Sequence, residues 1–251
     1  MPITDIDDVL TELAVIVADT KKRRDPLGYF AALYRQVTLR VKTGIAQGKF
    51  EDGPRMSRFD ASFANAYFRA YQRHQKHQSP GRAWGFAFDR ARLDRTLIVQ
   101  NLLLGINAHI NLDLGVVTGT TFPPAQLGGF HKDFNRINAT LASLIPSVRE
   151  TVEQFSPLLG EITDIDGPDV LRALQFSVDA ARDQAWRAAN LVSVTPTPLR
   201  PLLTETLDDQ AKFLGRVVAD PPEPMASVVR RVRKAESDDV VAIISALDQL
   251  A

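Results

Sequence analysis

The sequence predicts an all-α protein, folded as a single-domain bundle of many helices. Apolar residues recur at helical spacing along most of the chain. Strand signals are missing, because no segment sustains an alternation of polar and apolar residues and no Asn-Gly pair marks a hairpin. One stretch, 97–117, is apolar on nearly every side and should therefore run through the middle of the fold. We expect one helical domain over 1–251, organised around this central helix.

Four helices are predicted before the central one, from apolar residues at helical spacing and from the residues at their ends. Thr4 and Asp5 can cap the first helix, and Pro26 can open the second. Gly48 and the polar stretch EDGP should end the second helix. The predicted ranges are 3–22, 26–47, 58–78 and 81–93.

Prolines divide the chain after the central helix. The segment FPPAQLGGF predicts a loop over 122–130, because its prolines oppose a continuing helix. Pro146 should kink or divide the helix that begins at His131, and DPPEP should separate the last two helices. The predicted helical ranges are 131–145, 167–191, 199–218 and 225–250.

The composition excludes several classes of protein and of site. The 30 Lys and Arg residues balance 30 Asp and Glu residues, which argues against a dedicated nucleic-acid binder. The absence of cysteine excludes disulfides, thiolate catalysis and metal sites built on cysteine. Phosphate-binding loops of the GxGxxG or GxxxxGK[ST] type, the GxSxG nucleophile turn and the HExxH zinc motif are also missing.

The N-terminus and the central helix bear on where the protein is located. The N-terminus lacks the basic start and apolar run of a signal peptide. The mostly apolar first part of the central helix is about ten residues, roughly half the length that a bilayer requires. We therefore expect a cytoplasmic protein without a membrane span, whose partner is a small molecule.

The central helix carries the residues that suggest chemistry. Polar side chains in such an apolar helix are costly unless each finds a partner, and their density predicts a ligand pocket. His109 and Asp113 are four residues apart and so share one face of the helix. His131 and Asp133 follow in the next segment and complete the constellation. The polar residues of the central helix are Gln100, Asn101, Asn107, His109, Asn111 and Asp113.

The first hypothesis is a metal-dependent hydrolase acting on a small or amphipathic substrate. His109, Asp113 and His131 would hold zinc, iron or manganese, since imidazole and carboxylate form a common ligand set for these ions. Asp133 or Asp60 would act as a base or as a fourth ligand. Arg182 would anchor an anionic group of the substrate.

Two other hypotheses use the same polar residues without catalysis. In a non-catalytic binding protein, they would orient a small ligand among aromatic side chains. In a purely structural reading, they would form a buried hydrogen-bond network, with the function on the surface. Bound metal would favour the hydrolase, and an open cavity without metal would favour the binding protein. A closed core in which every polar group is hydrogen-bonded would favour the structural network. The residues expected to line a pocket are Asn107, Asn111, Asn135, Asn138, Tyr67, Trp84 and Trp186, with Phe63 beside them.

Five segments of the chain resemble, in order, a bacterial family of unknown function catalogued as DUF5995. They are FANAYFRAY (63–71), AWGFAFD (83–89), LLLGINAHINLDLG (102–115), HKDFNRIN (131–138) and ARDQAWRAA (181–189). The resemblance spans about 25–195, so that 196–251 forms a helical extension. It implies no known activity. It implies that the polar and aromatic residues of these motifs belong to one common set, namely Asn107, His109, Asn111, Asp113, His131, Asp133, Asn138, Arg182 and Trp186.

A more distant resemblance concerns helical zinc-dependent phospholipases C and P1-type nucleases. These enzymes use one His-x-x-x-Asp motif on a central helix and a second on a later helix. His109 and Asp113 match the first motif, whereas the second position reads His131-x-x-x-Asn135. The resemblance therefore implies a reduced site of one or two metal ions.

Overall fold

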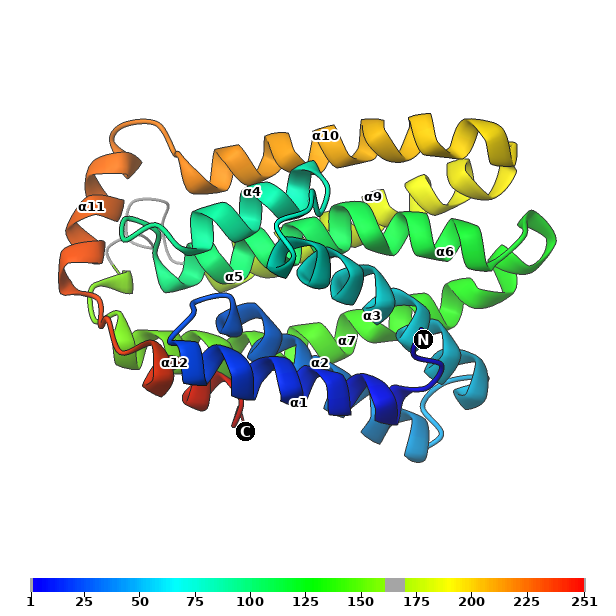
Figure 1. Ribbon diagram of the computed structural model, residues 1–251. Helices are drawn as coiled ribbons and strands as arrows, with labels where there is room; N and C mark the ends of the chain where they lie inside the picture. Colours follow the sequence, from blue (N-terminus) through cyan, green and yellow to red (C-terminus); the bar gives the residue numbers. More distant parts are fainter. Residues whose placement is uncertain (1, 161–169, 251) are drawn as a thin grey trace.

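The computed structural model describes residues 2–160 and 170–250, without the side chains of 170–177. Within these residues the protein is built of helices and contains no strand, which confirms the predicted all-α class (Figure 1). The helices are α1 (Ile6–Arg23), α2 (Gly28–Ala46), α3 (Gly53–Gln75), α4 (Arg82–Ala91), α5 (Ile98–Asn107), the π-helix η1 (Ala108–Leu114), α6 (Gly115–Thr121), α7 (Pro124–Phe155), α9 (Val170–Val194), the short η2 (Thr197–Leu199), α10 (Arg200–Ala219), α11 (Met225–Ala235) and α12 (Val240–Leu247).

Local signals explain how the first helices begin. The carboxylate of Asp5 accepts hydrogen bonds from the backbone N–H groups of Asp7 and Asp8, as expected for an N-cap. The predicted start of the third helix is wrong, because α3 begins at Gly53 rather than near residue 58. Asp52 caps α3 and a proline occupies its first turn, where no backbone donor is needed. The stretch EDGP thus both separates two helices and starts the second of them.

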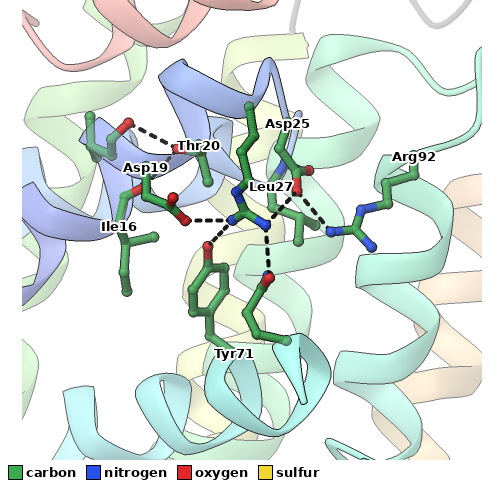
Figure 2. Close-up of polar contacts among 10 residues, drawn as sticks. Ile16, Asp19, Thr20, Asp25, Leu27, Tyr71 and Arg92 are labelled. Carbon is green, nitrogen blue, oxygen red and sulfur yellow. Dashed lines mark hydrogen bonds and ion pairs between the residues drawn. The ribbon is translucent and has the colours of Figure 1, made fainter. Parts of the chain in front are cut away.

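A polar network around the buried carboxylate of Asp25 fixes the turn between α1 and α2 against α4 (Figure 2). The Asp25 carboxylate accepts hydrogen bonds from the backbone N–H of Leu27 and from Nη2 of Arg92, at 3.1 and 2.8 Å. Arg23 donates from Nη2 to the hydroxyl of Tyr71 on α3 at 2.8 Å. The two exposed arginines thus satisfy the buried Asp25 carboxylate and the buried Tyr71 hydroxyl, which would otherwise be costly to bury.

The segments α5, η1 and α6 form one continuous central rod. Its length and composition would suit a membrane span, but 67% of its most apolar window is buried against other helices of the chain. Glycines allow two of these neighbours to approach closely. A Cβ added at Gly105 would collide with the ring of Phe30 on α2, and one added at Gly115 would lie 2.8 Å from Cβ of Ala188 on α9. The central position predicted for this stretch therefore rests on close packing on more than one side.

The loop predicted over 122–130 is wrong for most of its length, and of the two effects predicted for Pro146, a kink or a division of the helix, the division does not occur. The segment 124–130 is the first part of α7 rather than a loop, because a proline is tolerated where a helix begins. Pro146 does not divide the helix, which continues to Phe155. A proline removes one backbone hydrogen bond, and buried side chains on both sides of it, Leu144 and Val152, hold the helix against the core.

The C-terminal region 225–250 forms two helices instead of the one predicted. The chain leaves the helical path after α11, and the Asp239 carboxylate then caps α12 by accepting from the backbone N–H of Ala242. Glu236 in the break accepts a hydrogen bond from the backbone N–H of Ile98, at the start of α5. α11 therefore lies across one end of the bundle, at the left of Figure 1, while α12 packs on α1 and α2.

Candidate functional site

An apolar cavity of about 390 Å³ follows the central rod from Leu97 to Leu114. Its walls come from α2, α3, α5, η1, α7, α9, α10 and α11, and nearly all of the lining side chains are apolar. Ordinary binding sites for small molecules have volumes of about 300–1,000 Å³. Representative lining residues are Val37, Leu103, Ile106, Leu141, Val148 and Met225.

Two of the polar side chains in the cavity wall are already paired. Gln100 donates to the carbonyl of Val218 at 2.9 Å and accepts from the backbone N–H of Leu97 at 3.1 Å. Arg149 pairs with Glu153 at 2.5 Å. The other polar residues of the described lining are Tyr34, Asp60, His109 and Arg182.

His109 is oriented by Asp113, as their spacing predicted. Nδ1 of His109 lies 3.1 Å from Oδ2 of Asp113, and Nε1 of Trp84 donates to the same oxygen at 2.9 Å. An ionised carboxylate only accepts hydrogen bonds, so Nδ1 carries the proton and Nε2 has a free lone pair. Burial lowers the pKa of His109 below its ordinary value, and Asp113 offsets only part of that effect. The imidazole is therefore neutral near pH 7 and able to accept a proton at Nε2.

Aromatic rings enclose this histidine. Phe63 stacks on the imidazole with ring centroids 3.7 Å apart, and the Tyr34 ring lies 4.6 Å away. Phe30, Trp84 and Tyr67 surround it at 5.8, 6.0 and 6.3 Å. The rings exclude water from the imidazole, which explains the direction of its pKa shift.

The backbone of this segment is π-helical over Ala108–Leu114, the stretch that carries both His109 and Asp113. Such wide turns are rare and occur often at functional sites. The hydrophobic pattern did not predict the π-helix, because a segment that is apolar all round shows no change of helical period.

Several polar atoms beside His109 have no partner in the part of the chain that the structure describes. Nε2 of His109, Oδ2 of Asp60 and the hydroxyls of Tyr34 and Tyr67 are buried without a hydrogen bond. Asp60 lies inside α3, one helical turn before Phe63. Because α3 begins at Gly53, the Asp60 carboxylate does not cap this helix. Burial raises its pKa to about 7. Unpartnered buried groups cost about 1–3 kcal/mol each, and a bound molecule could satisfy them.

Asp133 lies in a different cluster, outside the cavity lining. Its carboxylate accepts from the backbone N–H of Glu51 at 2.7 Å, from Arg55 at 2.7 Å and from Arg136 at 3.0 Å. Burial alone would raise the pKa of Asp133, but these hydrogen bonds hold it below its ordinary value. The carboxylate is fully engaged in joining α7 to the start of α3, and this geometry does not support a role as a base or a metal ligand.

Of the three expected metal ligands, His109 and Asp113 lie together, but His131 does not join them. His131 is exposed, and its ring stacks on Trp186 with centroids 4.3 Å apart. Its Nε2 lies 3.2 Å from the amide nitrogen of Asn135. His109 and Asp113, in contrast, are buried. Among the described residues, no group of three or more His, Asp or Glu side chains could share a metal ion.

The asparagines and tryptophans expected to line a pocket have other positions. Asn107 donates to the Ala211 carbonyl at 2.7 Å and accepts from Asn111 at 3.0 Å, which ties the rod to α10. Trp84 donates a hydrogen bond to Asp113 and does not itself line the cavity. Of the thirteen site residues predicted, His109, Asp60 and Arg182 line the cavity. Those outside the lining are Asn107, Asn111, Asn135, Asn138, Tyr67, Trp84, Trp186, Asp113, His131 and Asp133.

The family model described as a family of unknown function, DUF5995, matches residues 6–221. The chain belongs to DUF5995. The match extends beyond the predicted span of 25–195 and includes every helix that contributes to the cavity except α11. No curated protein and no solved structure matches the chain. The resemblance to zinc-dependent phospholipases C and P1-type nucleases is therefore not confirmed.

Proposed function

We propose that this DUF5995 protein binds one elongated, mostly apolar small molecule in the cavity along α5 and η1. The cavity itself is the observation that carries the proposal. It follows the rod from Leu97 to Leu114, a distance of about 25 Å at the rise of a helix. A long and narrow molecule fits this shape better than a compact one.

The energetics favour an occupied cavity. The cavity is partly open to solvent, so the cost of about 24 cal/mol per Å³ that applies to closed apolar cavities, about 9 kcal/mol for 390 Å³, is an upper bound here. The whole folding free energy of a typical domain is about 5–15 kcal/mol. Water would gain little by filling the space, because most of the wall offers no hydrogen-bond partner. An apolar ligand removes this cost and so stabilises the fold.

The geometry gives less support to a metal-dependent hydrolase. That reaction requires several ligands around one ion, and His131 and Asp133 are held away from His109 and Asp113 by the contacts described above. The polar groups at the η1 end of the cavity instead favour a ligand that is apolar along its length and polar at one end.

Filling the cavity tests the proposal. Val37 lines the cavity, whereas Val15 is 58% exposed on α1. We expect the Val37→Trp variant to bind the dye Nile red, whose fluorescence rises in apolar sites, at least about tenfold more weakly than the wild type. The matched Val15→Trp variant should bind as the wild type does. Equal binding by all three proteins, or no binding by the wild type, would contradict the proposal.

A further inference from the structure

We propose that the molecule in this cavity is a single-chain amphiphile ending in a carboxylate, and that the carboxylate pairs with Arg182. This inference rests on the proposed function, because it names the class of ligand that the cavity holds. It begins with a buried cation. Arg182 lines the cavity and is only 2% exposed.

Arg182 has no carboxylate partner in the described part of the chain. Asp179 and Asp183, on the same helix, attract it electrostatically, but neither lies close enough to form an ion pair with it. Burial lowers the pKa of Arg182 to about 10, so the side chain remains charged near neutral pH. A buried charge without a counter-ion is costly, and a ligand carboxylate would supply the missing charge.

The guanidinium is held in a fixed position. Its Nε donates to Oδ1 of Asn138, and its Nη2 donates to the carbonyl of Phe134 at 2.5 Å. The same group lies over the Phe134 ring, 4.4 Å from the centroid. An arginine has five N–H donors in a planar fork, so these two contacts leave others for a ligand. A rigid fork of this kind is suited to a planar carboxylate.

The wall beyond Asn138 accommodates the rest of the ligand. Leu141, Ile145, Val148 and Val152 follow Asn138 at helical spacing on α7, and all four line the cavity. From Asn138 to Val152 the helix rises about 21 Å. The cavity thus places one positive charge beside a long apolar wall, which is the pattern of a fatty-acid site.

The charge and the volume favour one carboxylate and one chain. Arg149, the other cation among the described residues of the lining, is already paired with Glu153. Among the described lining residues, Arg182 is therefore the one cation without a carboxylate partner. A single cation balances a monoanion, whereas a phosphate dianion would leave a negative charge uncompensated in an apolar space. The volume of 390 Å³ lies near the lower end of the range for ligand sites and favours one acyl chain over two.

Displacement of Nile red by matched ligands tests this inference. We expect hexadecanoate to displace the dye from the wild type at a concentration at least about tenfold lower than hexadecanol, because the charge-assisted pair with Arg182 is available only to the acid. The Arg182→Met variant should lose this preference, and Arg182→Lys should keep part of it. The matched control is Arg187→Met, which removes an exposed arginine of the same helix and should behave as the wild type.

Each outcome separates the two proposals. If the dye binds but the wild type does not distinguish acid from alcohol, or if Arg182→Met keeps the preference, the carboxylate assignment is wrong while the binding function stands. Stronger displacement by phosphatidic acid than by hexadecanoate would also overturn the assignment. If Arg182→Met fails to fold, an unchanged preference in Arg182→Lys and in Arg182→Gln would contradict it. No dye binding by the wild type would contradict the proposed function itself.

Discussion

The clusters around Asp133 and around His109 are both buried and polar, but they differ in hydrogen bonding. The Asp133 carboxylate accepts from one backbone N–H and from two arginines. In the His109 cluster, Nε2 of the histidine, Oδ2 of Asp60 and the Tyr34 hydroxyl have no partner among the described residues. The first cluster lies outside the cavity lining, and the second forms part of it.

This difference separates a structural cluster from a candidate binding site. Nearly all buried polar groups in native proteins are hydrogen-bonded, so a fully satisfied cluster needs no ligand. A group of buried polar atoms without partners is energetically unfavourable unless something else compensates for it. Burial and residue type alone do not distinguish the two clusters, whereas the state of their hydrogen bonds does.

The largest expected effect comes from breaking the satisfied cluster. The Asp133→Ala variant leaves Arg55 and the Glu51 N–H without their acceptor, and we expect the free energy of unfolding to fall by about 3–5 kcal/mol. Denaturant titration measures this loss. Nile red binding by the folded fraction should not change. A folded Asp133→Ala protein that no longer binds the dye would show that the two clusters do not have separate roles.

A smaller effect is expected from Asp60, and its sign depends on pH. The raised pKa of about 7 means that the native state holds a proton that the unfolded state releases near pH 4. Stability conferred by this proton is therefore present at low pH and declines between about pH 4 and pH 7, at up to about 1.4 kcal/mol per unit. We expect Asp60→Asn, which cannot ionise, to be up to about 4 kcal/mol more stable than the wild type at pH 8.

Thermal unfolding of both proteins from pH 5 to pH 8 checks this prediction, and the difference should shrink toward pH 5. Burial also raises the pKa of Glu236 to about 7, and it lowers that of His109, so their contributions to the pH dependence have opposite signs. Both groups are present in wild type and variant, and their contributions cancel in the comparison. An equal difference at both pH values would contradict the ionisation of Asp60.

The smallest effect sharpens the comparison with a matched pair of tyrosines. The Tyr34 hydroxyl has no partner among the described residues, whereas the Tyr71 hydroxyl accepts from Arg23. We expect Tyr34→Phe to raise the free energy of unfolding by about 1 kcal/mol and Tyr71→Phe to lower it by about as much. Denaturant titrations without added ligand measure both changes. Destabilisation by both substitutions would mean that Tyr34 is satisfied in solution.

Much of the fold could be predicted from the sequence, because apolar stripes and caps act locally. The helix starts at Gly53 and Pro124 were missed for a local reason too, since a proline reads as a break although it is tolerated in a first helical turn. The π-helix could not be predicted, because the surrounding stretch is apolar on nearly every side. Without a distinct polar face, its sequence does not show how many residues make one helical turn.

The candidate site was predictable only where polarity contrasted with its surroundings. His109 and Asp60 stand out among apolar and aromatic neighbours, and both line the cavity. Asp133 looked equivalent in the sequence, because the partners that satisfy it come from segments 78 and 82 residues away. The apolar lining could not be recognised, since a side chain that faces a cavity and one that packs in a core have the same composition.

The π-helix has a consequence for the far end of the rod. Its hydrogen bonds span one residue more than those of an α-helix, so every later residue is rotated relative to an uninterrupted α-helix, by about 100° for one extra residue. Gly115 and Gly119, on α6, face the backbone of α9 only with this offset in place. The same wide turn that carries His109 and Asp113 therefore sets the angular phase at which α6 meets α9, the helix that carries Arg182.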